Sequence, residues 1–250
     1  MQKRKVKSLY LFISSLVIGL FSFPFAFAKT VEKRSKQLLS ATADSANYFA
    51  SLKPTVISVY DSLHLNISGI NRKVFEMAEK GYEKIIEEGR LLNDSIVSII
   101  DFSLPSSAKR LYIVDLKNFE ILFNTYVAHG RNSGKEFAKS FSNSESSFKS
   151  SPGFYITGNM YTGKHGKSLK LEGLEKGIND NAEKRAVVIH GADYVNESLI
   201  HSQGYIGRSQ GCPAVSPKES NQIINTIKEG TCLFIYSPEE SYQSKSVYLN

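Results

Sequence analysis

Short apolar runs rich in β-branched and aromatic residues recur after residue 91 and constrain the fold more than any other feature of the sequence. They read IVSIIDFS, RLYIVDL, EILFNTYVAHG, GFYITG, AVVIHGA and TCLFIYS. Runs of this length and composition predict β-strands. Residues 116–119 lie between the second and third run and predict a hairpin turn. We therefore expect a mostly antiparallel, sandwich-like β domain over residues 92–240.

Two helical patterns accompany these strands. Apolar residues recur at helical spacing within residues 29–91, most clearly over residues 70–89. A second helix is expected over residues 217–230, because Ser216 is a suitable N-cap and Pro217 suits the first helical position. The fold class is therefore predicted to be α+β, with a helical N-terminal region that packs on the β domain.

The first 28 residues have the pattern of a secretory signal peptide. Four basic residues (Lys3, Arg4, Lys5 and Lys7) precede an apolar run that closes on an Ala-Phe-Ala sequence at residues 26–28. This order of charge, apolar segment and small residues predicts export and cleavage after Ala28. Serine residues and a proline interrupt the run, which disfavours the alternative of a retained membrane anchor. We expect the mature protein in the periplasm or cell envelope, without a membrane segment.

The charge balance argues against a nucleic-acid partner. The chain has 31 Lys and Arg residues and 24 Asp and Glu residues, a formal net charge of +7. Removal of residues 1–28 takes away four basic residues and no acidic ones, so 27 basic residues remain against 24 acidic ones and the charge falls to +3. No basic cluster with interleaved aromatic residues follows. A mildly basic exported protein fits an anionic polymer such as cell wall.

The chain has two cysteines, and their surroundings differ. Cys232 lies in the apolar run TCLFIYS and is expected to be a buried residue that behaves as a small hydrophobe. Cys212 lies among turn residues in GRSQGCPAV. An oxidising compartment also permits a disulfide between the two, which would leave no free thiol at position 212.

The turn around Cys212 suits a nucleophile. A thiol attacks a carbonyl as the thiolate, and an ordinary cysteine needs a base or nearby amide dipoles to reach that form near neutral pH. The Ser209-Gln210-Gly211-Cys212 turn can direct backbone N–H groups at one point, where they would also bind an oxyanion. Pro213 has a fixed φ and would keep the following backbone rigid.

His190 is the candidate base for this thiol. It ends the apolar strand AVVIHG and is followed by Gly191, so its side chain can project into a cleft. A third group would have to orient the imidazole. The carbonyl of Gly191 and the carboxylate of Asp193 are both candidates for this role.

Several further residues are candidates for substrate binding. His129 and Arg131 follow another strand, and Arg208 lies four residues before Cys212, where a guanidinium would bind a substrate carboxylate in bidentate fashion. Ser209 and Tyr194 complete this group, with packing as the alternative for Tyr194. We expect His165 to be solvated. The serine-rich segment 139–151 is expected to be a solvated loop, with a mobile flap beside the site as the alternative.

These motifs together resemble the L,D-transpeptidase catalytic domain of the YkuD type. His190-Gly191 followed by Ser209-Gln210-Gly211-Cys212 is similar to its His-Gly and Ser/Thr-His-Gly-Cys signature, and the similarity extends over most of residues 97–237. The chain departs from the signature at Gln210, where the superfamily often has His, and at Ala214, where it often has Arg or Asn. The second departure leaves a substrate-holding position unfilled.

The resemblance implies a function and a set of roles. Cys212 would be acylated by a peptidoglycan stem peptide while His190 takes its proton. The carbonyl of Gly191 would orient His190, and amides around Gly211 and Cys212 would hold the oxyanion. Neither cofactor nor metal is implied. An amine acceptor would give cross-linking and water would give an L,D-carboxypeptidase, and the sequence leaves this choice open.

Two other classes of function are considered. A zinc-dependent peptidoglycan peptidase would use His129, His165, His190 and Asp193 as ligands, although their spacing matches no zinc motif. A non-catalytic module that binds the cell wall would follow if Cys212 were bridged to Cys232.

Overall fold

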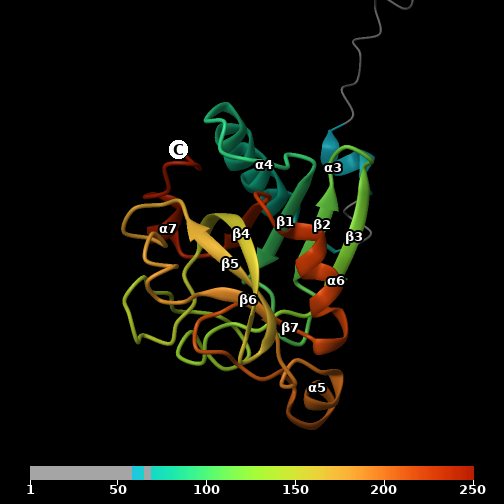
Figure 1. Cartoon of the computed structure of the whole chain (residues 1–250), viewed down its shortest axis with the longest axis vertical. Coiled ribbons are helices and arrows are strands. Elements are labelled where there is room, and N and C mark those ends of the chain that lie inside the picture. The colour runs from blue at the N-terminus through green and yellow to red at the C-terminus, as the bar shows by residue number, and fades with distance from the viewer. Residues whose placement is uncertain (1–57, 65–68) are drawn as a thin grey trace, which may run out of the picture. The chain divides into compact units, whose positions relative to one another are not determined.

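The computed structural model describes residues 58–64 and 69–250 (Figure 1). The predicted signal peptide, residues 1–28, lies outside the described residues. The eight described strands form one sheet in the order β3-β2-β1-β8-β4-β5-β6-β7. Among the described helices, none has the length and apolar composition needed to cross a membrane.

The strands pair mostly antiparallel, as predicted. Their bounds are β1 Ile96–Asp101, β2 Leu111–Asp115, β3 Glu120–Thr125, β4 Gly153–Gly163, β5 Gly166–Gly173, β6 Val188–Gly191, β7 Ala214–Val215 and β8 Cys232–Tyr236. Among the strand pairs of the described residues, β1–β8 and β6–β7 are parallel and the others are antiparallel. Residues 116–119 form the predicted turn between the antiparallel strands β2 and β3. Together with the helices, this sheet confirms the α+β class.

The central strands β1 and β8 are buried along their whole length because both faces of the sheet are covered. In β8, Cys232 and Phe234 belong to the core on one face, and Leu233 and Ile235 to the core on the other. Helix α4 (Arg72–Glu87) packs into the first core and α6 (Pro217–Ile227) into the second. Figure 1 shows these two helices on different sides of the sheet. Short helices α3 (Val59–Ser62), α5 (Glu197–Gln203) and α7 (Glu240–Gln243) complete the described chain.

Both predicted helices are present, with shorter C-terminal ends than expected. Helix α4 ends at Glu87, two residues before Gly89, whose φ of 66° is left-handed. Helix α6 begins at Pro217 as predicted but ends at Ile227 rather than at residue 230. Its C-terminal end is fixed by the hydroxyl of Thr231, which donates a hydrogen bond to the Ile227 carbonyl at 2.7 Å.

Strand β5 was not predicted from the sequence, and it matters for the site. Its lysines, Lys167 and Lys170, are exposed, while Leu169 and Leu171 are buried in the core. Strand β5 forms a long hairpin with β4 whose turn contains Lys164 and His165. In the sequence of β5, the alternation of apolar and polar residues is too short, and the lysines too frequent, for the segment to be distinguished from a loop.

The packing of α4 on the sheet requires a glycine at position 81. Gly81 is buried inside the helix, and a Cβ at this position would overlap the ring of Phe154. That ring cannot retreat freely, because it stacks on Phe234 with ring centroids 4.4 Å apart. The close approach of α4 to Phe154 therefore explains why position 81 is a glycine, although glycine weakens helices in general.

We predict that Gly81→Ala lowers the free energy of unfolding by about 1–2 kcal/mol, because overpacking outweighs the better helix propensity of alanine. Urea denaturation would measure this difference. Glu83→Ala on the exposed face of the same helix is the control and should change stability by less than about 0.5 kcal/mol. Equal or greater stability of Gly81→Ala would contradict the packing of α4 against β4.

Candidate active site

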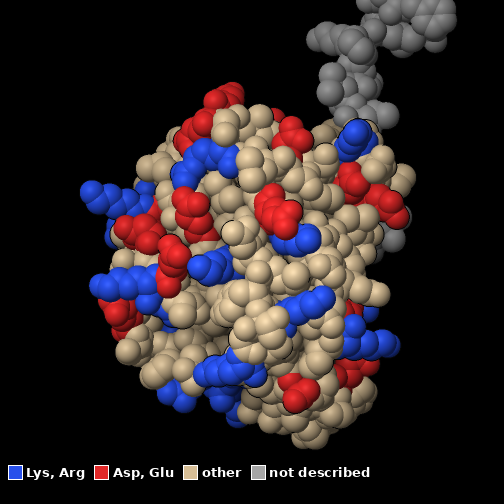
Figure 2. Space-filling model, in the orientation of Figure 1, with Lys and Arg blue, Asp and Glu red and all other residues tan. Residues whose placement is uncertain are grey.

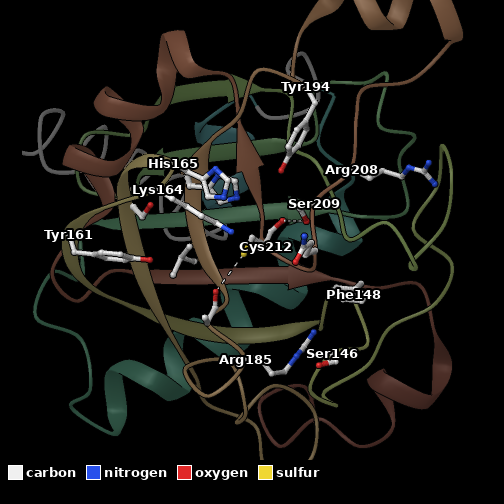
Figure 3. A pocket seen from close by; sticks show the side chains of 15 residues that line it. Ser146, Phe148, Tyr161, Lys164, His165, Arg185, Tyr194, Arg208, Ser209 and Cys212 are labelled. Carbon is white, nitrogen blue, oxygen red and sulfur yellow. Dashed lines mark hydrogen bonds between the residues drawn. The ribbon is translucent and has the colours of Figure 1, made fainter.

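Strands β6 and β7 bring Cys212 and His190 to one cavity. The strands pair in parallel, with His190 opposite Ala214, and neighbouring strands lie about 4.8 Å apart. Cys212 precedes Ala214 by two residues, so it lies beside the start of β6. Both Cys212 and His190 line a cavity of about 490 Å³ (Figure 3). The pair that the sequence predicted to react is therefore together in space.

The walls of this cavity come from five parts of the chain. They are the β4–β5 hairpin (Tyr161, Lys164, His165, Ser168), the serine-rich loop (Ser146, Phe148), β6 with the residues before it (Arg185, Ala186, Val188, His190), Tyr194, and the segment before β7 (Arg208, Ser209, Gln210, Cys212). The lining includes two arginines, a lysine and two histidines but no aspartate or glutamate. The cavity is therefore a cationic environment that favours an anionic ligand or a thiolate.

The turn before Cys212 is held by the side chain and backbone of Ser209. Its hydroxyl accepts a hydrogen bond from the Gly211 N–H at 3.0 Å and donates one to the Cys212 carbonyl at 2.6 Å. Its backbone N–H donates to the His129 carbonyl at 2.9 Å, and its carbonyl accepts from the Arg131 N–H at 2.8 Å. Ser209 thus shapes the turn, and its hydroxyl proton is not free for the substrate contact expected from the sequence.

Gly211 has a structural role that the sequence predicted only in part. Its φ of 124° is a conformation that favours glycine, and a Cβ would stand 2.9 Å from the Lys149 carbonyl oxygen. Its N–H, expected to bind an oxyanion, is instead engaged by Ser209. The N–H of Cys212, like that of Gln210, has no acceptor among the hydrogen bonds of the described residues, and Pro213 has no N–H.

The thiol of Cys212 is held in its neutral form. Its Sγ donates to the carbonyl oxygen of Ala186 at 3.7 Å. Burial raises the pKa of the thiol above its ordinary value of 9.0, and the N–H of Val188 and the charges of Arg185 and Lys164 oppose this increase. The charged form therefore needs a proton acceptor in the same cavity.

His190 has the protonation state of a general base. The ring is 4 % exposed, and its Nδ1 lies 2.9 Å from the Gly191 carbonyl oxygen. A carbonyl only accepts hydrogen bonds, so Nδ1 carries the proton and Nε2 keeps a lone pair. Burial lowers the pKa of His190, with a smaller contribution from His165. Of the two groups considered for orienting His190, the Gly191 carbonyl is the one bonded to it.

His165 stacks on the ring of His190, a contact that the sequence did not predict. The ring centroids are 4.5 Å apart and the ring planes are inclined by 24°. His165 is exposed, as expected, but the β4–β5 turn carries it to the mouth of the cavity (Figure 3). Only knowledge of the β5–β6 register, which places Ser168 opposite His190, could have indicated this contact.

Tyr194 and Arg208 line the cavity in different ways. In Figure 3 the hydroxyl of Tyr194 points into the cavity, and burial, followed by proximity to Cys212, raises the pKa of Tyr194 to about 12. The guanidinium of Arg208 points away from Cys212 and donates to the Gly134 carbonyl at 3.2 Å. Tyr194 therefore has a free hydroxyl donor at the site, whereas Arg208 faces its outer rim.

His129 and Arg131 do not line this cavity, in contrast to the sequence-based expectation. His129 is fully buried, and its Nδ1 accepts a hydrogen bond from the Arg110 guanidinium at 2.7 Å. Burial and the charge of Arg110 lower the pKa of His129 to about 3. The Arg131 guanidinium stacks over the ring of Phe148 at 4.1 Å. The main chain of this segment supports the Cys212 turn, but its side chains are directed elsewhere.

Among the described residues, the structure contains neither a Cys212–Cys232 disulfide nor a group of side chains arranged as a zinc site. Cys212 and Cys232 are both free, and Cys232 is 0 % exposed in the core beneath α4, where burial raises its pKa to about 12. Within residues 58–64 and 69–250, no three His, Cys, Asp or Glu side chains are grouped to hold a metal ion. His129 in particular is sequestered by Arg110.

Comparison with known proteins gives one match to a family. A family model described as the L,D-transpeptidase catalytic domain matches residues 66–236. A search of curated proteins found no match. Among solved structures, the L,D-transpeptidase from Mycobacterium smegmatis is 13 % identical with a TM-score of 0.36, over 57 % of this chain and 59 % of that chain. The helical cell shape determining protein Pgp2 from Campylobacter jejuni is 15 % identical with a TM-score of 0.38, over 72 % of this chain and 62 % of that chain. This chain therefore spans less than two thirds of either protein.

The stacked histidines give a prediction about titration. Because His165 lowers the pKa of His190, we predict that His165→Phe, which retains a stacking ring, raises the pKa of His190 toward its ordinary value of 6.5. NMR titration of the histidine ring protons would measure the change. His201→Phe on exposed α5 should leave the pKa of His190 unchanged. An unchanged value in His165→Phe would show that the two rings are not coupled.

Proposed function

This chain belongs to the family of L,D-transpeptidase catalytic domains, and from this premise we propose that it is an exported cysteine-dependent enzyme acting on peptidoglycan stem peptides. The observation that carries the proposal is the shared cavity of Cys212 and His190, in which the base is neutral and its Nε2 is unprotonated. The signal-peptide pattern of residues 1–28 supports a location in the periplasm or cell envelope.

The first half of the reaction forms a thioester. Nε2 of His190 takes the proton from Sγ of Cys212 as the sulfur attacks the carbonyl carbon of the third stem residue. The carbonyl oxygen becomes an oxyanion, for which the Cys212 N–H and the Tyr194 hydroxyl are the available donors. The bond to D-alanine then breaks, and the imidazolium of His190 returns the proton to the amine that leaves.

The second half of the reaction releases the thioester. An acceptor nucleophile enters beside His190, which removes its proton as it attacks the thioester carbon. The C–S bond then breaks, and His190 returns the proton to the sulfur of Cys212. An amine from a neighbouring stem gives a cross-link, whereas water gives a shortened stem. Both outcomes use the same acyl-enzyme and the same two residues, so they differ only in which acceptor occupies the cavity.

The charges of the cavity fit a substrate of this kind. Stem peptides carry free carboxylates, and the lining contains Lys164, Arg185 and Arg208 without an acidic residue. The wider surface is not uniformly basic, since Lys and Arg alternate with Asp and Glu over the face seen in Figure 2. The cationic lining of the cavity, rather than a basic surface as a whole, is therefore the feature that would attract an anionic peptide.

Replacement of Cys212 tests the nucleophile. We expect the purified protein, incubated with a disaccharide-tetrapeptide, to gain the mass of an acyl group at Cys212, and Cys212→Ala to gain none while keeping its fold. Intact-protein and peptide mass spectrometry would locate the adduct, and the product masses would distinguish dimer from tripeptide. An adduct on Cys232 or on a serine would contradict the assignment, and loss of acylation with EDTA would restore the zinc alternative.

Replacement of His190 tests the base. We predict that His190→Ala lowers the rate of acylation by about two to four orders of magnitude, the usual contribution of a positioned base. In the unmodified protein the rate should fall only as pH drops through the lowered pKa of His190, that is, below 6.5. His201→Ala is the matched control on an exposed helix. An unchanged rate and pH profile in His190→Ala would place the base elsewhere.

A further inference from the structure

Arg185 precedes the residue that touches the thiol of Cys212. A tight turn fixes its backbone: its N–H donates to the Asn181 carbonyl at 2.8 Å, and the next N–H, of Ala186, donates to the Glu183 carbonyl at 2.9 Å. Ala186 has a φ of 53°, an uncommon conformation for a residue with a side chain, and its carbonyl accepts the Cys212 thiol. Backbone strain of this kind is concentrated at functional sites.

The guanidinium of Arg185 joins this turn to the serine-rich loop. Nη1 donates to the Ser142 carbonyl at 2.8 Å and to the Ser151 hydroxyl at 2.9 Å. Nη2 donates to the Lys149 carbonyl at 2.5 Å and to the Ser147 hydroxyl at 3.3 Å. These four hydrogen bonds hold residues 142–151 against the cavity.

The loop held by Arg185 lies directly on the turn of the nucleophile. The Ser150 hydroxyl donates to the Gly211 carbonyl at 3.3 Å, and the Lys149 carbonyl occupies the space that a Cβ of Gly211 would need. Nη2 of Arg185 itself is 3.3 Å from that Cβ position. The guanidinium is therefore next to the residue that precedes Cys212, and Figure 3 shows it on the side of Cys212 opposite Lys164 and His165.

The charge of Arg185 has no carboxylate partner among the described residues. All four groups to which it donates are neutral, and it takes part in none of the described ion pairs. Its neighbour Lys184, by contrast, pairs with Glu145 at 2.6 Å. A half-buried charge without a counter-ion is costly. The reaction itself supplies the missing negative charge when Cys212 loses its proton.

We propose that Arg185 is a positioning residue for the nucleophile, which clamps residues 142–151 over the Gly211–Cys212 turn and supplies the positive charge that stabilises the Cys212 thiolate. The inference rests on the proposed function in that it takes Cys212 as the nucleophile. The other titratable groups that line the cavity are Lys164, His165, His190, Tyr161, Tyr194 and Arg208, and the guanidinium of Arg208 points away from Cys212. None is acidic, so the thiolate has no competitor for Arg185 inside the cavity.

Electrostatics agree with this arrangement. Burial is the main cause that raises the pKa of Cys212, and Arg185 is among the groups that lower it. The interaction is mutual, since Cys212 raises the pKa of Arg185 against the effect of burial. Arg185 therefore offsets part of the desolvation that the enclosed site imposes on the thiolate.

Alkylation by iodoacetamide tests the proposal without a stem peptide, because the thiolate sulfur forms a bond to the acetamide carbon and iodide leaves. The rate at Cys212 would be measured against pH by mass spectrometry. Arg185→Gln and Arg185→Lys both lose the four-bond clamp but differ in charge. We expect Arg185→Gln to react about tenfold more slowly at neutral pH and the midpoint of its curve of rate against pH to lie at higher pH. For Arg185→Lys we expect this midpoint to stay close to that of the unmodified protein.

The controls separate charge from folding. Lys184→Gln removes the neighbouring ion pair to the same loop and should leave the midpoint unchanged. Arg185→Met replaces Arg185→Gln if the latter does not fold. Faster hydrogen exchange of residues 142–151 in each Arg185 variant would report the loss of the clamp. A midpoint in the neutral variants equal to that of the unmodified protein would overturn the proposal, even if the protein does not acylate with stem peptides.

Discussion

The site depends on the backbone pairing of Ala214 with two neighbouring segments, strand β6 and the segment around Ala128. On one side Ala214 lies opposite His190 in the parallel β6–β7 pair, and on the other it bridges to Ala128, whose N–H donates to the Ala214 carbonyl at 2.8 Å. This two-residue strand fixes where the preceding turn ends. Ser209, held at the start of that turn by the segment after Ala128, fixes where it begins. Cys212 therefore has little freedom to move away from β6.

Enclosure of the site determines how its chemistry starts. Burial disfavours charge on both reacting groups, so it raises the pKa of the Cys212 thiol and lowers that of His190. These two directions favour a neutral thiol beside a neutral imidazole over a preformed ion pair in the resting site. In the proposed reaction, proton transfer would accompany attack on the substrate, and the cavity cations Lys164 and Arg185 would stabilise the negative charge that develops.

Much of the fold could be predicted because the central strands have a strong signal. In β1 and β8 both faces are buried, which produces runs in which most residues are apolar, and α6 begins at a proline with suitable N-terminal residues. Strand β7 has only two residues and could not be recognised by periodicity. Strand β5 carries lysines on its exposed positions, and its apolar pattern is correspondingly weak.

The sequence pointed to the two residues that we propose as nucleophile and base, which line one cavity, and it was less informative about the residues around them. Cys212 and His190 carry local signals, a thiol in a glycine turn and a histidine at the end of an apolar strand. His129 has a similar local signal, yet its ring turns into the core toward Arg110. His165 and Arg185 have no such signal, because sheet register and a loop contact bring them to the cavity. Such contacts depend on tertiary structure, which a single sequence does not reveal.

The ultraviolet absorbance of the thiolate, followed as a function of pH in the unmodified protein and in Cys212→Ala, tests the neutral-pair mechanism most directly. The account predicts that the difference between the two proteins shows a single rise, above the ordinary thiol pKa of 9.0, while His190 titrates separately below 6.5. A thiolate signal that is already present at neutral pH and disappears as His190 is replaced by alanine would contradict it, because that result would establish a preformed ion pair.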